Sequence, residues 1–261
     1  MHAAGIFTGE RLVASDPLFA ADFSRHLKAY QFAQAHVGGK RVLDAGCGDG
    51  YGTHLLAEAA ERALGVDRSA DTVAVAARRY QGVNLSYRVC ALDRLSDLGE
   101  QFDVVCNFQV IEHLVEPRPF LKQVRQILAP GGCLIVTTPN RLQSLVENPY
   151  HVHEYIVGEL EQLLREVFTR VDMRGVCPNA RAMAYDRARA AQATRILRLD
   201  PLGVRHLLPR TLIEWVYPKL ARLVRRRITP ANGAAAAISA ADFTIESALE
   251  GALDLLAICR S

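Results

Sequence analysis

Short apolar runs alternate with longer amphipathic runs from residue 41 onward, and this alternation limits the folds that the chain can adopt. The apolar runs are RVLDA, ALGVD, NLSYRVC, FDVVCNF and CLIVTT. Between them stand GTHLLAEAAERA, ADTVAVAARRY and PFLKQVRQIL, whose apolar residues recur with helical spacing. Such alternation predicts an α/β fold with a parallel, doubly wound sheet. The strands lack clean polar and apolar alternation, as expected where helices cover both faces of a sheet.

The same pattern predicts how the 261 residues are divided. Residues 1–40 are expected to form a helical cover, in which HLKAYQFAQAHV has an apolar stripe. Residues 41–178 are expected to form the core. Residues 179–250 then form a basic helical insertion. It ends in the alanine-rich stretch TPANGAAAAISAAD, which is expected to be a flexible or weakly ordered linker. The last strand of the core is expected within 251–261.

The positive charge of the chain is concentrated in the insertion. Residues 181–228 contain twelve Arg or Lys and three Asp or Glu, a net charge of +9. Because the whole chain carries +3, the remaining residues carry −6. Over residues 210–228 apolar and basic side chains recur together, a pattern that suits an anionic surface such as a membrane, a phosphorylated carrier or an acidic glycan. A merely solvated helix face is the alternative. Nucleic acid is an unfavoured partner, because no RNA-binding module is recognisable.

The cellular location is predicted from the lack of membrane-spanning and secretory features in the sequence. No apolar run approaches the ~18 residues of a membrane span, and the start MHAAGIFTGERLVASD is too polar for a secretory signal. The six cysteines form no CxxC pair, so neither a disulfide framework nor a zinc site is expected. We expect a cytoplasmic protein without a transmembrane segment, with peripheral association at a membrane as the alternative.

A glycine-rich loop, VLDAGCGDGYG at residues 42–52, follows the first predicted strand and opens a helix. Glycine there lets the backbone touch a ligand. A dinucleotide fingerprint would require glycine where Tyr51 stands, and a phosphate-binding P-loop would require Gly-Lys-Ser/Thr, which is absent. Asp67, at the end of the second strand, could instead accept both hydroxyl hydrogens of a ribose, and Asp44 precedes the glycines. The loop therefore indicates a nucleoside ligand, with a tight packing turn as the alternative.

Four blocks together, VLDAGCGDGYG, LGVD, FDVVCNFQVIEHL and LAPGGCLIVTTPN, resemble the class I S-adenosylmethionine-dependent methyltransferases over residues 38–140. The shorter segments TGER, HLKAY, FQVIEHL, TPNR and NPYHVHEY resemble a bacterial branch that is often associated with glycans or other secondary products. The resemblance implies a Rossmann-like, mostly parallel sheet of seven strands with the last strand antiparallel. It also implies S-adenosyl-L-methionine as the cofactor, bound by the core.

The resemblance also implies roles for particular residues. The methionine end of the cofactor would be held by Asp44, Gly46, Cys47, Gly48 and Gly50. Asp67 would bind the ribose and Arg68 would flank the adenine, while Asn107 to Gln109 would pass beside the sulfonium. Ala91 stands where the family commonly has an acid or amide for the adenine, so backbone groups near Leu92 are expected to read it.

Three histidines are candidates for accepting a proton from the methyl acceptor: His113, His151 and His153. His113 lies in QVIEH, where some methyltransferases have ExxEH and bind a divalent metal; Gln109 replaces the first acid, so no metal is expected. His151 and His153 lie in NPYHVHEY beside Glu154. A structural role in holding loops remains the alternative for all three histidines.

The predicted function is O-methylation of a small-molecule or glycan-type acceptor, with the insertion and the N-terminal helices forming the acceptor pocket and lid. Two alternatives stay open. One is a methyltransferase associated with a membrane or RNA through residues 181–228. The other is a partner subunit that binds S-adenosylmethionine without catalysis.

Overall fold

The computed structural model describes residues 17–144, 148–197, 216–226 and 238–261. The helices among them are η1 (Pro17–Phe19), α1 (Ala20–Gln34), α2 (Tyr51–Ala57), α3 (Ala70–Arg79), η2 (Leu92–Leu98), η3 (Ile111–His113), α4 (Pro117–Ile127), α5 (Val157–Arg165), α6 (Ala180–Leu197) and η6 (Ala240–Asp242). The strands are β1 (Arg41–Ala45), β2 (Arg62–Asp67), β3 (Leu85–Val89), β4 (Phe102–Phe108), β5 (Leu128–Pro139), β6 (Arg170–Pro178), β7 (Phe243–Glu246) and β8 (Asp254–Arg260). Residues 216–226 form one further helix.

The strands form one eight-stranded sheet in the order β3-β2-β1-β4-β5-β8-β6-β7. The pairs β1·β2, β2·β3, β1·β4 and β4·β5 are parallel, whereas β8 runs antiparallel to both of its neighbours and β7 runs antiparallel to β6. The predicted Rossmann-like sheet with an antiparallel last strand is thus confirmed. Its chain order switches direction at β1, so the carboxyl ends of β1 and β4 border a crevice where α/β proteins bind ligands.

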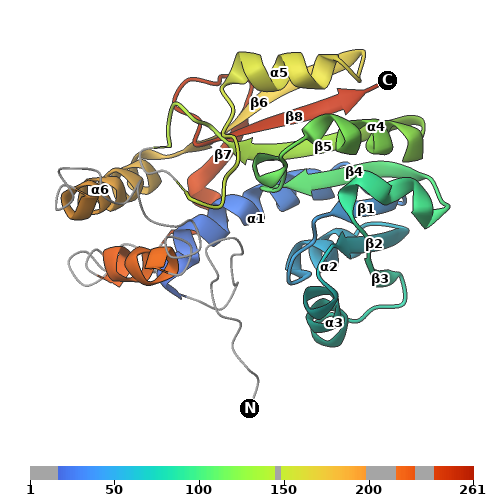
Figure 1. Cartoon of the computed structure of the whole chain (residues 1–261), viewed down its shortest axis with the longest axis horizontal. Coiled ribbons are helices and arrows are strands. Elements are labelled where there is room, and N and C mark those ends of the chain that lie inside the picture. The colour runs from blue at the N-terminus through green and yellow to red at the C-terminus, as the bar shows by residue number, and fades with distance from the viewer. Residues whose placement is uncertain (1–16, 145–147, 198–215, 227–237) are drawn as a thin grey trace.

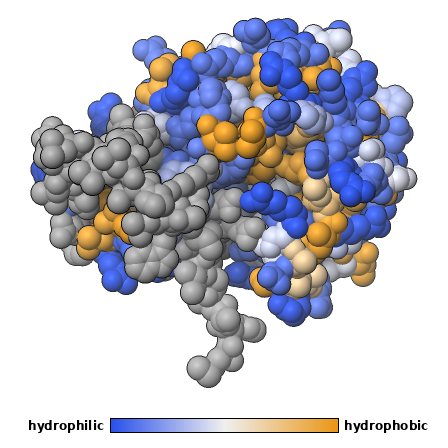
Figure 2. All heavy atoms as spheres, in the orientation of Figure 1, coloured by the Kyte–Doolittle hydropathy of each residue, from blue (hydrophilic) through white to orange (hydrophobic). Residues whose placement is uncertain are grey.

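Two hydrophobic cores lie on opposite faces of the sheet, and helices cover both faces (Figure 1). The strands β1, β2, β4, β5 and β8 each contribute side chains to both cores. Phe120 of α4 and Leu160 of α5 pack on one face with Leu43 of β1. Tyr30 of α1 and Leu56 of α2 pack on the other face with Val42. Burial on both faces explains why the strand sequences are continuously apolar. The face seen in Figure 2 is mostly hydrophilic, with hydrophobic residues gathered toward its centre.

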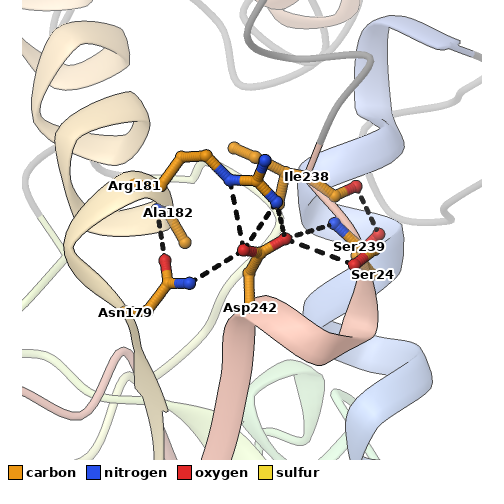
Figure 3. A network of polar contacts seen from close by, with 7 residues as sticks. All are labelled: Ser24, Asn179, Arg181, Ala182, Ile238, Ser239 and Asp242. Carbon is orange, nitrogen blue, oxygen red and sulfur yellow. Dashed lines mark hydrogen bonds and ion pairs between the residues drawn. The ribbon is translucent and has the colours of Figure 1, made fainter.

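A carboxylate network fastens the return of the insertion to the start of α6 (Figure 3). Asp242 accepts hydrogen bonds from Arg181 at 2.6 Å, from Asn179 Nδ2 at 2.8 Å and from the backbone N–H of Ser239 at 2.8 Å. The alanine-rich linker that the sequence predicts lies mostly outside the described residues. For residues 238–242, at the end of this linker, the prediction was wrong, because they are packed and hydrogen-bonded. They lead into β7, which brings the sheet to eight strands where seven were expected.

The helix at 216–226 differs from the expected surface helix. Arg225 is 7% exposed and its guanidinium binds Asp22 of α1 at 2.7 Å, so this residue does not belong to a solvent-facing basic surface. Leu220 and Leu223 are exposed, as are Lys219 and Arg226. Among the described residues, none of the helices combines the length and hydrophobicity that a membrane span requires.

Replacing Asp242 by Ala is expected to lower the free energy of unfolding by about 1–3 kcal/mol, since charge-assisted hydrogen bonds are lost. Its partners hold the pKa of Asp242 below its usual range, chiefly through the hydrogen bond from Arg181. A lowered pKa contributes stability above the ordinary carboxyl range and loses it as the pH falls. Urea unfolding of wild type and D242A should therefore differ less at pH 3 than at pH 7. An equal difference at both values would contradict this account.

Candidate active site

The glycine-rich loop turns sharply between β1 and α2 because three of its glycines have positive φ. The φ values are 90° at Gly46, 53° at Gly48 and 87° at Gly50. A Cβ atom at Gly46 would lie 2.6 Å from Val110 Cγ2, and one at Gly50 would lie 2.7 Å from the Cβ of Ala76. At Gly48 a Cβ would meet no protein atom within 4 Å. Gly46 and Gly50 are thus required by packing, whereas Gly48 leaves space beside its backbone.

That space belongs to a cavity of about 400 Å³, within the range of small-ligand and cofactor sites. It lies at the carboxyl ends of β1, β2 and β4, as the switch in strand order requires. Eight of the residues predicted for the site line it: Gly46, Cys47, Gly48, Asp67, Arg68, Leu92, Gln109 and His113. Ala91 and Asp93 line it on either side of Leu92, so this whole segment borders the cavity.

Asp67 is the last residue of β2, and its carboxylate is oriented by the turn that follows. Its Oδ1 accepts a hydrogen bond from the backbone N–H of Ser69 at 2.9 Å, and Ser69 in turn caps α3. The half-buried side chain borders the cavity beside the glycine-rich loop, since the backbone N–H groups of Gly46 and Cys47 donate to the carbonyl of Val66. A carboxylate oxygen has two lone pairs, so this hydrogen bond leaves it able to accept a further donor.

Asp44, Gly50 and Asn107 are placed behind the cavity wall. Asp44 is 1% exposed and accepts hydrogen bonds from Thr53 Oγ1 at 2.7 Å and from Tyr30 at 3.2 Å. Burial raises the pKa of Asp44 to about 7, although these two donors oppose the shift. Asn107 is fully buried and donates from Nδ2 to the carbonyl of Ala45 at 2.7 Å. In this structure the three residues shape the loop and do not line the cavity.

An aromatic wall of the cavity was not predicted from the sequence. His26, Tyr30, Tyr51 and Phe108 all border the cavity, and their rings meet edge to face. His26 hydrogen-bonds through Nε2 to the carbonyl of Phe108 at 3.3 Å and through Nδ1 to the Tyr51 hydroxyl. Burial lowers the pKa of His26 to about 4, so the ring is neutral near pH 7. The four-residue spacing in HLKAY, which puts His26 and Tyr30 on one face of α1, was the available signal.

Gln109 has a φ of 56° and is the only residue other than glycine with positive φ in the described part of the chain. A side chain in this conformation costs about 1–3 kcal/mol, and such strain gathers at functional sites. Its backbone N–H donates to the Thr137 carbonyl at 3.0 Å, which holds the turn after β4 against β5. Gln109 thereby stands at the cavity directly after Phe108.

His113 borders the same cavity from η3, and its ring is oriented by a neighbouring loop. Its Nδ1 lies 2.9 Å from the carbonyl oxygen of Tyr150. Because a carbonyl can only accept, Nδ1 carries the proton, and Nε2 of the neutral ring carries the lone pair. The turn containing Tyr150 is held in turn by Glu112, whose carbonyl accepts from the N–H groups of Val152 and His153.

The other two histidines lie farther from the cavity. The His151 ring is 5.0 Å from that of His113 between centroids, and its Nδ1 binds Glu154 at 2.5 Å. His153 is turned toward Glu159, with 3.4 Å between its Nε2 and a carboxylate oxygen. Neither residue lines the cavity. The structure therefore brings His113 alone of the three candidates to its wall.

A carboxylate oxygen of Glu112 and ring nitrogens of His113 and His151 lie within 4.8 Å of one another, a spacing that could admit a metal cation. Glu112 is 1% exposed, and burial raises the pKa of its carboxyl to about 7. His151 already uses Nδ1 toward Glu154 and Nε2 toward Asn148, so it could ligate a metal only by giving up one of these bonds.

Comparison with known proteins identifies the family. Residues 43–136 match the model of a methyltransferase domain. A probable S-adenosylmethionine-dependent methyltransferase of Mycobacterium tuberculosis is 35% identical over 185 residues, which cover 69% of this chain and 67% of that protein. A similarly named protein of Mycolicibacterium smegmatis is 39% identical over 165 residues, covering 60% of this chain; the chain spans 62% of that relative's length. The chain therefore belongs to the S-adenosylmethionine-dependent methyltransferases, and its cofactor is S-adenosylmethionine.

Two further comparisons give a more distant relative and a solved structure. A ubiquinone biosynthesis O-methyltransferase of Cereibacter sphaeroides is 36% identical over 141 residues, 53% of each chain. A crystal structure from Thermotoga maritima, described as a possible histamine N-methyltransferase, aligns with a TM-score of 0.58 at 14% identity and covers 93% of this chain and 91% of that one. At this identity the second comparison bears on the fold alone.

Replacing Gly48 by Ala is expected to weaken binding of S-adenosylmethionine at least tenfold, because the added methyl group would occupy space beside the cavity wall. Gly39 provides the matched control, since its φ of 62° is similar and a Cβ there also meets nothing within 4 Å. Both substitutions should cost about 1–2 kcal/mol of stability through the left-handed backbone. Calorimetric titration and urea unfolding would separate the two effects. Equal affinities of the two variants would contradict the assignment of Gly48.

Proposed function

We propose that S-adenosylmethionine lies in the cavity with its methionine end along the backbone of Gly46 to Gly48. The open space beside Gly48 supports this placement, since a ligand could touch the backbone there without a side chain intervening, and Gly46 and Cys47 line the same cavity. The ribose hydroxyls would donate to Asp67, and the adenine would lie between Arg68 and the segment at Leu92. Gln109 and the aromatic wall would border the sulfonium end.

The methyl acceptor in this proposal is a hydroxyl group of a small molecule or of a glycan-type compound. Its oxygen lone pair forms the new C–O bond as the S–C bond breaks, and the sulfonium charge is neutralised. The acceptor's proton passes to Nε2 of His113. The products are a methyl ether, S-adenosylhomocysteine and a protonated imidazole, which returns its proton to solvent.

One observation favours an oxygen acceptor: His113 lies at the cavity wall, and its Nδ1–H donates a hydrogen bond to the Tyr150 carbonyl. An alcohol or phenol must lose a proton during transfer, whereas an amine needs only to be neutral before the reaction. A histidine held in this tautomer can serve as the base for an oxygen acceptor, whereas a neutral amine acceptor has little need of a base. The similarity to a ubiquinone biosynthesis O-methyltransferase over about half of each chain points in the same direction.

The placement of the cofactor can be measured without knowing the acceptor. Wild-type protein should bind S-adenosylmethionine and S-adenosylhomocysteine in calorimetric titrations and should not bind NAD. Asp67→Ala should lose about 1.5–3 kcal/mol of binding free energy, because the hydrogen bonds from the ribose are to a charged acceptor. Asp71→Ala is the control, since Asp71 is an exposed acid in the first turn of α3. Tight NAD binding, or equal affinities of both variants, would sink the ribose assignment.

The role of His113 can be measured as release of S-adenosylhomocysteine with a panel of phenols, catechols, sugars and amines. With an oxygen acceptor, His113→Gln should lower kcat about 10²- to 10⁴-fold, the usual contribution of a general base, and should leave cofactor affinity nearly unchanged. His153→Gln, which alters a histidine away from the cavity, should have little effect. Turnover of amines alone, or equal losses in both variants, would refute this role.

A further inference from the structure

The helix at 216–226 contacts the loop that orients His113. The ring of Tyr217 meets that of Tyr150 edge to face, with 6.0 Å between centroids and 71° between planes. Burial raises the pKa of Tyr217, and the negative charge of Glu154 adds to the shift, so the phenol lies near a second residue of the same loop. A helix far along the chain thus packs on the loop that holds His113.

The other end of this helix is fixed to α1. Arg225 donates from Nε at 3.1 Å and from a terminal nitrogen at 2.7 Å to the same oxygen of Asp22, and both side chains are largely buried. The guanidinium also lies 4.2 Å from the centre of the fully buried Phe19 ring. The charge of Arg225 contributes to holding the pKa of the Asp22 carboxyl well below its usual range. A buried pair of this kind is strongly destabilised if one partner is removed, so the helix has a defined position.

Tyr150 lies between this helix and the catalytic candidate. Its carbonyl accepts from His113 Nδ1 at 2.9 Å, and its backbone N–H donates to Asn148 Oδ1 at 3.1 Å. The loop is pinned at Asn148 and again where Val152 and His153 donate to Glu112. The peptide group that carries the Tyr150 carbonyl is held between those points, since the His151 N–H donates to the Asn148 carbonyl at 3.0 Å. The ring contact with Tyr217 adds a restraint on the side chain of the same residue.

We infer that Tyr217 is a positioning residue, which acts through Tyr150 to keep the carbonyl on His113 Nδ1 and thereby to keep the lone pair of the neutral ring on Nε2. The inference deepens the proposed function, on which it rests for the use of that lone pair. Which imidazole nitrogen carries the proton is set by the hydrogen bond that the other nitrogen makes. If the carbonyl moved away, the Nε2–H tautomer would become populated, and the lone pair would then lie on Nδ1, the nitrogen nearest the Tyr150 loop.

The tautomer can be read directly by nitrogen NMR of histidine-labelled full-length protein saturated with S-adenosylhomocysteine. In wild type the Nδ1 resonance of His113 should lie at the protonated position and Nε2 at the unprotonated one. In Tyr217→Ala the two resonances should move toward each other, as the tautomers mix. Tyr217→Phe retains the ring and should match wild type.

Tyr150→Ala removes the same ring contact from a surface loop while it leaves the backbone carbonyl in place, so it covers the case in which Tyr217→Ala does not fold. It should shift the His113 resonances in the same direction, and adding Tyr217→Ala should produce little further change. Unshifted resonances in a folded Tyr217→Ala or Tyr150→Ala protein would overturn the inference. So would a shift of equal size in Tyr217→Phe, because the ring contact would then be irrelevant.

Activity separates this inference from the function on which it rests. With an oxygen acceptor, the alanine variants should lose up to about 100-fold in kcat with unchanged affinity for S-adenosylhomocysteine, as a small misplacement of a catalytic group can do. If the resonances shift while kcat stays at the wild-type value, Tyr217 still positions His113, but His113 is not the base. If the wild-type ring already carries its proton on Nε2, the positioning inference fails whatever the acceptor.

Discussion

The buried carboxylate of Asp44 connects the three elements that form one side of the cavity. It stands at the end of β1 and is held by Tyr30 of α1 and Thr53 of α2, at 3.2 and 2.7 Å. With the glycine turn between β1 and α2, these bonds determine where the backbone of Gly46 to Gly48 lies. Burying a carboxyl group is costly unless it is hydrogen-bonded. The two donors that offset this cost for Asp44 come from helices that are packed on the sheet. The cavity is therefore a consequence of how the core closes.

The helical additions are part of the site and not separate attachments to it. α1 contributes His26 and Tyr30 to the cavity lining, and Asp22 on its first turn binds Arg225 of the helix at 216–226. Another α1 residue, Arg25, lies 3.0 Å from the buried Asp254 at the start of β8. Charge pairs thus join the core sheet, the N-terminal helix and the basic insertion. The charge of Arg225, which looked like a surface property in the sequence, is used inside the molecule.

The sheet could be predicted because each strand buried on both faces leaves a continuous apolar run, and each connecting helix leaves a periodic one. β7 could not, since FTIE is short and follows an alanine-rich stretch, and its place is set by pairing with β6. Gly48 and Asp67 could be placed at the cavity from the sequence, because the strand ends of a parallel sheet lie at one edge where ligands bind. Tyr51 and His26 were missed because their meeting depends on tertiary packing. Arg225 looked solvent-facing because its partner, Asp22, is about two hundred residues away in the chain.

The position of β8 has a consequence for how the chain can vary. β8 pairs with β5 on one side and β6 on the other, although the insertion separates it from β6 in the chain. The sheet is therefore completed by a segment made after the insertion, and the ends of the insertion are held close together whatever lies between them. Loop-closure entropy rises only logarithmically with length, by about 0.6 kcal/mol for each doubling. Loop closure therefore sets little limit on the length of this segment. A different insertion would instead have to replace the contacts that Arg225 and Asp242 make with the rest of the molecule.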